Sequence, residues 1–393
     1  MKTLLLFCLG IIFFNISLSQ PGIYISSSYI SDDNLFKNSN KNFSNISSSN
    51  INAFYNYFTD NSQLKFSYNF NLNSFNNFPN ANNNINAIDI GYAYNFDDET
   101  ILLISGNFSG KTVKEEYNIY KENDFSLSSS YDFSYNEIHS AQIRYNYSNV
   151  SYTNLPDFSY SEHVFGYTST FTWQTKTTLF LDFNLGYKIY SNDMITYYTT
   201  NDTSFVTPKG YGYGAKLKTI INSKSISKNS PDNNLQFLFT TKIAQSIIDN
   251  LGVSLSYSLR KSIINNSRYI LGNDYYFSND NLFDDNYSYN ENDFEMNLTY
   301  LIFTDLILKS SFEYQIKKYL NKYPDENNDY IERNDNKYLF LMHLSKNFNL
   351  FDKILEKLNI YLYYIYTNNN SNVKYYNYNN NIFGLGLTAA ITF

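Results

Sequence analysis

The stretch from Thr178 to Ile189, with the sequence TLFLDFNLGYKI, decides the fold of this chain. Its odd positions are all apolar, whereas its even positions include Asp182 and Lys188. Strict alternation of this kind predicts a β-strand whose two faces meet different environments. The same period of two returns in residues 88–96, 251–260 and 306–317.

The length of these segments indicates which environments the two faces meet. Strand after strand has about ten residues and an apolar face that ends in Tyr, which matches the lipid-spanning strand of a tilted barrel. A secreted sandwich also alternates and is the alternative. Because lipid cannot pair with open backbone groups, a sheet in a membrane has to close. We therefore predict an all-β protein, a closed antiparallel transmembrane β-barrel.

The composition excludes several other classes of protein. The 393 residues carry a net charge of -7 and are 43% hydrophobic, 17% charged and 19% aromatic, with 41 Tyr and 33 Phe. A soluble domain usually has about a quarter charged residues, and a disordered chain is poor in rings. The mean hydropathy of -0.42 and the lack of long apolar runs past residue 19 exclude a bundle of membrane helices. The acidic pI near 5.1 argues against a nucleic-acid partner.

The first nineteen residues read as an export signal. Lys2 precedes an apolar core at 4–14, and the small residues Ser17 and Ser19 fit the positions before a cleavage site. A buried apolar segment is the alternative. We predict a signal peptide at 1–19 and a mature barrel at 20–393. Because Cys8 is the only cysteine, the mature chain has no disulfide and no cysteine-based metal site.

Sixteen segments are candidate strands, within a range of 14 to 18. They are 22–30, 50–58, 63–73, 85–96, 100–110, 123–135, 138–148, 160–173, 177–190, 234–247, 251–261, 291–303, 306–319, 337–349, 358–367 and 381–393. Residues 211–222 also resemble a strand, and we assign them to a large outer loop at 191–233; the alternative is two further strands there. Short turns alternate with long polar stretches around 31–49, 191–233, 263–290, 320–336 and 368–380. This asymmetry is typical of short periplasmic turns and long extracellular loops.

The chain stops on an alternating segment, IFGLGLTAAITF at 382–393. Its Leu385, Leu387, Ile391 and Phe393 resemble the signal that Gram-negative outer-membrane barrel proteins offer to their assembly machinery. A weaker likeness to the C-terminal half of large porin-like barrels lies in Arg333-Asn334-Asp335, Tyr364-Ile365-Tyr366 and 384–387. The resemblance implies a location in the cell outer membrane, with outer-membrane lipids around the barrel and the barrel-assembly machinery as a partner.

With sixteen strands, a barrel is wide enough for an aqueous path. The residues expected to line it are Asp89, Arg144, Asp182, Lys188, Arg260, Asp293, Glu295, Lys309, Glu313 and Lys317. Both signs of charge are present, so we expect little selectivity between anions and cations; the alternative is that these residues only cross-link the interior as ion pairs. Asp293, Glu295, Lys309 and Glu313 form the densest group, and we predict a constriction or an interior salt-bridge ladder there.

These features predict a passive porin-like channel for small polar solutes. The alternatives are a non-conducting structural or surface-binding barrel whose lumen is blocked by the loop at 191–233, and an outer-membrane hydrolase. The chain has three histidines, His139, His163 and His343, and no catalytic motif surrounds them, although His139 and His163 could approach each other across a hairpin. We therefore expect no enzymatic activity, no metal and no cofactor.

Overall fold

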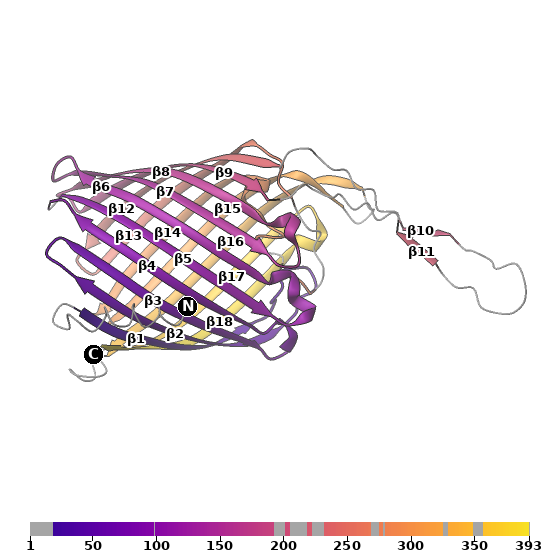
Figure 1. Ribbon diagram of the computed structural model, residues 1–393, viewed down its shortest axis with the longest axis horizontal. Coiled ribbons are helices and arrows are strands. Elements are labelled where there is room, and N and C mark those ends of the chain that lie inside the picture. Colours follow the sequence, from indigo (N-terminus) through magenta and orange to yellow (C-terminus); the bar gives the residue numbers. More distant parts are fainter. Residues whose placement is uncertain are drawn as a thin grey trace, which may run out of the picture.

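The computed structural model describes residues 19–97, 99–191, 201–204, 218–221, 232–268, 275–277, 280–324, 329–348 and 357–392. Figure 1 shows their strands forming a barrel, with each strand tilted relative to the barrel axis. The barrel strands are β1 (Ser19–Asp32), β2 (Ser44–Phe58), β3 (Ser62–Phe75), β4 (Asn83–Asn95), β5 (Thr100–Val113), β6 (Glu122–Ser134), β7 (His139–Tyr152), β8 (Tyr160–Trp173), β9 (Thr177–Tyr190), β12 (Asn233–Ile248), β13 (Leu251–Ile264), β14 (Tyr289–Phe303), β15 (Leu306–Pro324), β16 (Tyr330–Phe348), β17 (Lys357–Ser371) and β18 (Tyr378–Thr392).

These strands form one closed antiparallel sheet of sixteen, as predicted. Each strand pairs with its neighbours in the chain, and β1 pairs with β18 from Gly22 opposite Thr392 to Asp32 opposite Ile382, which closes the barrel. Between β9 and β12, β10 (Asn201–Ser204) and β11 (Lys218–Ile221) pair only with each other. The alternative with two further barrel strands is therefore wrong, because β9 pairs directly with β12.

The strands are longer than the sequence pattern indicated. β15 continues to Pro324 and β16 begins at Tyr330, so most of the polar stretch at 320–336 is strand and not loop. About ten tilted residues are enough to cross the hydrocarbon layer, and the remaining residues continue the sheet beyond it. Polar side chains do not end a strand there, since the backbone pairs regardless of which side chains it carries.

The connections divide between the two ends of the barrel. We call the end that holds the β1–β2, β3–β4, β5–β6, β7–β8, β9–β12, β13–β14, β15–β16 and β17–β18 connections the loop end, and the opposite end the turn end. The loop end also carries η2 (Pro79–Ala81), η3 (Glu115–Tyr120), η4 (Pro156–Phe158), η5 (Asn286–Ser288) and η6 (Lys374–Tyr376). None of the described helices is long and apolar enough to cross a membrane.

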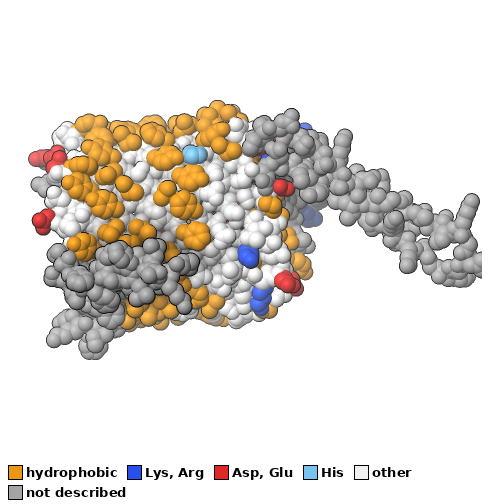
Figure 2. All heavy atoms as spheres, viewed as in Figure 1, with side chains coloured by type: hydrophobic (Ala, Val, Ile, Leu, Met, Phe, Trp, Pro, Cys, Tyr) orange, Lys and Arg blue, Asp and Glu red, His pale blue; other side chains and the backbone are white. Residues whose placement is uncertain are grey.

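The outer surface of the barrel is apolar. Figure 2 shows apolar side chains spread over the side wall, whereas charged side chains gather near the two ends. Exposed side chains on this wall include Ile88, Phe108, Phe165, Leu255, Phe294, Phe312, Leu362 and Leu385. Exposure of so many large apolar side chains is what a lipid-facing wall requires and what a water-facing surface avoids.

Buried apolar side chains gather at the loop end, where loops fold against the inner rim. They form one cluster, which we call the mouth cluster: Leu35, Phe36, Phe75, Ala81, Tyr117, Tyr120, Tyr152, Tyr160, Tyr190, Leu282 and Phe283. The Phe36 ring packs edge-on against Phe277 with centroids 5.2 Å apart, and Tyr120 packs against the same ring at 5.5 Å. The β1–β2 loop, η3 and the β13–β14 loop are thus held together inside the mouth.

Candidate functional site: the inner wall and the inward-folded loop

The ten side chains predicted to line the lumen lie on one face of the sheet. Each is on the strand face opposite to the exposed apolar residues; Asp89 lies between Ile88 and Ile90, and Glu295 lies between Phe294 and Met296. Most of the ten contact other polar side chains. Asp89, for example, accepts hydrogen bonds from Ser67 at 3.1 Å and from Asn107 at 2.6 Å.

Arg144 and Asp182 form the most connected pair of the ten. The Nη2 of Arg144 lies 2.5 Å from the Oδ1 of Asp182, which also accepts a hydrogen bond from Thr168 at 2.6 Å. Arg144 is on β7 and Asp182 is on β9, so the guanidinium has to cross β8. It does so over Gly166, where any Cβ atom would overlap the arginine side chain. The glycine therefore makes this bridge across a strand possible.

The densest predicted group does not form a salt-bridge ladder. Glu295 on β14 stands directly opposite Glu313 on β15, so two carboxylates face each other. Glu295 accepts hydrogen bonds from Ser256 at 3.1 Å and from Ser311 at 3.2 Å. Among the ion pairs of the described residues, none joins two of the four predicted side chains. The ladder prediction is wrong because cross-strand register, which the sequence does not state, pairs like charges here.

Two of the three predicted lysines, Lys188 and Lys317, bind to acids of the β13–β14 loop. Lys317 of β15 donates to Asp284 at 3.3 Å, and Lys188 of β9 donates to Asp285 at 2.8 Å. The hydroxyl groups of Tyr319 and Tyr190 donate to the same two carboxylates at 2.5 Å and 2.9 Å. Since β9 and β15 stand apart in the barrel wall, two adjacent loop residues connect separate parts of the wall.

Further contacts fix this loop from the β8 and β12 side. Tyr287 donates a hydrogen bond to Glu162 of β8 at 2.5 Å, and Gln236 of β12 donates to the carbonyl of Asn286 at 2.6 Å. Arg268 forms an ion pair with Asp232 at 3.3 Å, and both side chains are buried. We call residues 275–277 and 280–288 the inward segment. The sequence predicts that the loop at 191–233 could block the lumen; most of that loop lies outside the described residues, and its role stays a prediction.

Two aspartates of the inward segment have opposite pKa shifts. For Asp284, burial by itself would raise the pKa, but the charges of Lys317 and Arg333 outweigh it and hold the pKa at about 2. For Asp280, burial raises the pKa, and the charge of Lys111 only partly offsets it. Asp284 is therefore a charged anchor, whereas Asp280 is an acid that its surroundings favour in the neutral form.

Sequence reasoning missed an arginine buried between rings near the same loop. The Arg333 guanidinium lies 3.9 Å from the ring centroid of Tyr319 and 3.5 Å from that of Tyr376, and its Nη2 contacts Asp335 at 2.5 Å. In the sequence, Arg333 stands out only as part of the weaker likeness that includes Arg333-Asn334-Asp335. The parity of the β16 residues could have placed it on the inner face, but its aromatic partners come from other strands and from η6.

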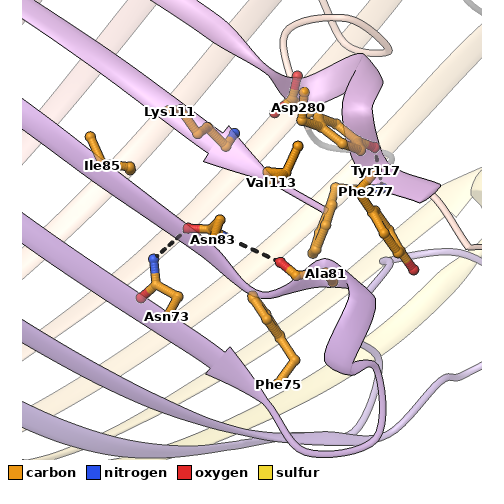
Figure 3. A pocket seen from close by; sticks show the side chains of 11 residues that line it. Asn73, Phe75, Ala81, Asn83, Ile85, Lys111, Val113, Tyr117, Phe277 and Asp280 are labelled. Atoms are coloured by element: carbon orange, nitrogen blue, oxygen red, sulfur yellow. Dashed lines mark hydrogen bonds between the residues drawn. The ribbon is translucent and has the colours of Figure 1, made fainter. Parts of the chain in front are cut away.

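A cavity of about 290 Å³ opens next to the mouth cluster (Figure 3). Its wall combines rings from Phe75, Tyr117, Tyr120 and Phe277 with polar and charged side chains, Asn73, Asn83, Lys111 and Asp280. Asn73 donates to Asn83 at 2.9 Å, and Asn83 donates to the carbonyl of Ala81 at 3.2 Å. The side chains that line the lumen at this height are thus both aromatic and polar.

The three histidines lie far apart. His139 stacks between Tyr135 and Phe171 at the turn end, with centroid distances of 4.6 Å and 4.3 Å. His163 bonds to the hydroxyl of Tyr145 at 2.7 Å near the start of β8, so the predicted approach of His139 and His163 does not occur; antiparallel pairing puts the two residues toward opposite ends. The described residues contain no group of three or more His, Cys, Asp or Glu arranged to hold a metal ion.

The last strand completes the wall. Leu385 and Leu387 are about half exposed on the outer face of β18, and Ile391 pairs with Ile23 of β1. Phe393 lies outside the described residues. Closure of the barrel therefore depends on the segment whose alternation resembles an assembly signal.

The barrel is similar to solved outer-membrane barrels. It superposes on OccAB1 of Acinetobacter baumannii with a TM-score of 0.54 and 8% identity, covering 96% of this chain and 97% of that one. The outer membrane protein OprD of Pseudomonas aeruginosa gives a TM-score of 0.50 at 8% identity, with 96% and 95% coverage. OccK1 (OpdK) of the same organism also gives 0.50 at 8% identity, with 95% and 99% coverage.

Identities this low establish a shared fold and nothing finer. The predicted resemblance to outer-membrane porin-like barrels is thus confirmed at the level of the fold. The sequence matches no protein-family model, and no curated protein matches it either.

Proposed function

We propose that this protein is a passive porin-like channel in the cell outer membrane, for small polar solutes. One observation carries the proposal: a closed sixteen-strand sheet presents apolar side chains outward and polar and charged side chains inward. An apolar outer wall suits lipid, and a polar inner wall suits water and the solutes dissolved in it. Both signs of charge on the inner wall favour polar solutes in general over one sign of ion.

The inward segment supports a narrowed channel more than a wide one. Asp284 and Asp285 draw the β13–β14 loop onto the inner wall, and the mouth cluster packs against it. A loop that rests on ion pairs and rings narrows the path at the loop end. The solutes that pass are therefore expected to be small.

The structural neighbours support the same location and cargo size. OprD is named as an outer membrane protein, and OpdK has been solved with vanillate, a small molecule. In this scheme the signal peptide at 1–19 directs export. Leu385, Leu387, Ile391 and Phe393 then present the last strand to the barrel-assembly machinery, and outer-membrane lipids surround the finished barrel.

Reconstitution into planar lipid bilayers tests the channel directly. The refolded full-length mature chain should give discrete conductance steps, and their size should stay below that of an unobstructed sixteen-strand pore because the inward segment narrows the mouth. Protein that is demonstrably inserted and folded but gives no steps would contradict the proposal.

The second candidate is a non-conducting barrel, and the inward segment is the observation that favours it. Two deletions separate the candidates: residues 269–283, in the β13–β14 loop, and residues 192–231, between β9 and β12. If the intact protein is silent and only the first deletion opens it, the barrel is plugged by the β13–β14 loop. If only the second opens it, the block lies in the loop at 191–233.

A further inference from the structure

One quarter of the inner wall carries no charge between its rims. Its strands are β17, β18, β1 and β2, whose inward faces we call the seam wall because β18 and β1 close the barrel there. Along the described residues of these faces, charged side chains occur at the rims, Lys357 at the turn end and Asp32 at the loop end. Between them the seam wall carries rings, amides, hydroxyls and small residues. The ten charged residues predicted to line the lumen all lie on other strands.

Three glycines let aromatic rings lie flat on the seam wall. Tyr361 stands opposite Gly386, Tyr363 stands opposite Gly384, and the Phe54 ring covers Gly22. A Cβ atom added at any of these glycines would overlap the ring opposite. Because each glycine has no side chain to hold the opposite ring away from the sheet, that ring lies flat over the glycine backbone. Its face is then parallel to the wall and turned toward the lumen.

The flattened rings continue into stacked neighbours. Tyr24 stacks on Phe54 with centroids 5.0 Å apart and planes 20° apart, and Tyr24 is 44% exposed. Tyr361 stacks with Tyr363 at 6.3 Å and 22°, and with His343 of β16 at 5.6 Å and 26°. Tyr24 pairs with Ala390 and Tyr361 with Gly386, so the two groups of rings are four residues, about 13 Å, apart along the strand.

Amide groups flank these rings. Asn50 and Asn52 lie on the same face of β2 as Phe54, and Asn359 lies on the same face of β17 as Tyr361. Asn50 donates a hydrogen bond to Asn69 of β3 at 2.5 Å, which extends the amide surface to the next strand. An amide offers both donors and acceptors, so it can pair with a hydroxyl group in either direction.

We propose that the seam wall binds the pyranose rings of neutral saccharides on their way through the channel, an inference that rests on the proposed function. The apolar C–H faces of a pyranose fit flat aromatic rings, and its hydroxyl groups fit the flanking amides. A solute with a carboxylate needs a cation, and the seam wall has none between its rims. Rings at two heights allow an oligosaccharide to contact both groups at once.

Binding is tested on the refolded chain in detergent, by isothermal titration calorimetry with maltotriose. Tyr361→Leu and Tyr24→Leu should each weaken binding about three- to tenfold, since each removes one stacking surface, whereas Tyr361→Phe should bind within twofold of the original chain. Tyr29→Leu is the matched control: Tyr29 is on the same strand as Tyr24 but lies on the outer face, 50% exposed, so binding should not change.

Gly386→Ala tests the positioning of the ring. The added methyl group must push Tyr361 off the wall, so maltotriose binding should fall about as much as in Tyr361→Leu although no ring is lost. Gly91→Ala is the control, because a Cβ there meets the Lys65 side chain only at 3.9 Å. A drop in both variants would indicate a general effect on the barrel and overturn the positioning argument.

These experiments do not depend on conductance. If the barrel binds maltotriose but gives no conductance steps, the proposed channel function is refuted and the proposed saccharide site is supported. If the barrel gives conductance steps but does not bind maltotriose, the saccharide inference is overturned and the channel function is supported. The same holds if maltotriose binds but the Tyr361→Leu and Tyr24→Leu variants leave the binding unchanged. Benzoate serves as the competing ligand: if benzoate binds and maltotriose does not, the rings serve planar aromatic anions and the saccharide assignment is wrong.

Discussion

The Nζ of Lys317 lies 3.3 Å from the Oδ2 of Asp284, so a residue of strand β15 holds a residue of the β13–β14 loop inside the barrel mouth. Tyr319 donates a hydrogen bond to the other oxygen of the same carboxylate at 2.5 Å. This arrangement converts a connection between two strands into part of the channel wall. The properties of the mouth should therefore respond to single substitutions in the loop.

Asp284→Asn should loosen the inward segment. The amide keeps a hydrogen-bond acceptor but loses the charge that pairs with Lys317, which stays buried without its ion-pair partner in the loop. We expect larger and noisier conductance steps in planar bilayers. Asp280→Asn is the control in the same segment: none of the ion pairs among the described residues includes Asp280, so its replacement should leave the steps unchanged. Equal effects of the two variants would contradict the anchoring role of Asp284.

The inward segment should stay docked far into acid. The pKa of Asp284 is lowered to about 2 from its ordinary 3.8, so its charge stabilises docking fully above about pH 4. That contribution is lost as the pH falls through 2. Asp280 has a raised pKa and acts in the opposite direction, since its protonation favours the docked loop. Conductance recorded from pH 7 down to pH 3 should therefore show no opening of the mouth, and opening already at pH 5 would refute this account.

Arg144→Ala should destabilise the barrel by about 2 kcal/mol. The substitution leaves Asp182, which is 8% exposed, without its cation. The urea midpoint of unfolding in detergent measures the change. Lys176→Ala removes the cation of the ion pair with Asp249 at the turn end, where both side chains are largely exposed, and should not move the midpoint. A shift of the same size in both variants would show that the Arg144–Asp182 ion pair stabilises the barrel no more than an exposed ion pair does.

Glu313→Gln should shift the ion preference of the channel toward anions. Glu313 faces Glu295 across β14 and β15, and removing one of two opposed carboxylates weakens the local negative field. The reversal potential under a KCl gradient measures this shift. Glu332→Gln is the control, because Glu332 is exposed on the outer face of β16. An unchanged reversal potential in Glu313→Gln would place these carboxylates outside the ion path.

Deletion of Phe393 should lower the outer-membrane level of the folded barrel several-fold without affecting export across the inner membrane. The expectation rests on the resemblance of the last strand to the assembly signal. Heat-modifiable mobility on gels reports the folded barrel, and signal-peptide removal reports export. Normal amounts of the heat-modifiable form would refute the role of this residue.

Much of the wall could be predicted because each strand carries its own signal. Residues 178–189 alternate so strictly that neither their type nor the facing of Asp182 depends on any other segment. All sixteen strands follow from this local rule. The ends of the strands could not be predicted from this rule. Polar residues often mark the end of a strand in a soluble sheet, but here the strands continue through polar residues beyond the hydrocarbon layer, as at the end of β15 and the start of β16.

The mouth could not be predicted in the same way. Asp284 and Asp285 belong to a stretch of Asn, Asp, Ser and Tyr that resembles the other polar loops of the chain. Their partners, Lys317 and Lys188, are 33 and 97 residues away in sequence. Ion pairs between residues so far apart in sequence depend on how the barrel closes, and a local sequence pattern cannot predict that.

By itself the sequence determined the class of fold and the face on which each of the ten predicted lumen residues lies, because a period of two is a property of neighbouring residues. Only the tertiary structure decided that Glu295 faces Glu313, that Arg144 reaches Asp182 over Gly166, and that Tyr361 and Tyr363 lie flat on Gly386 and Gly384. Each of these contacts depends on cross-strand register. Register is fixed when the whole sheet closes on itself, which is a condition on all sixteen strands together.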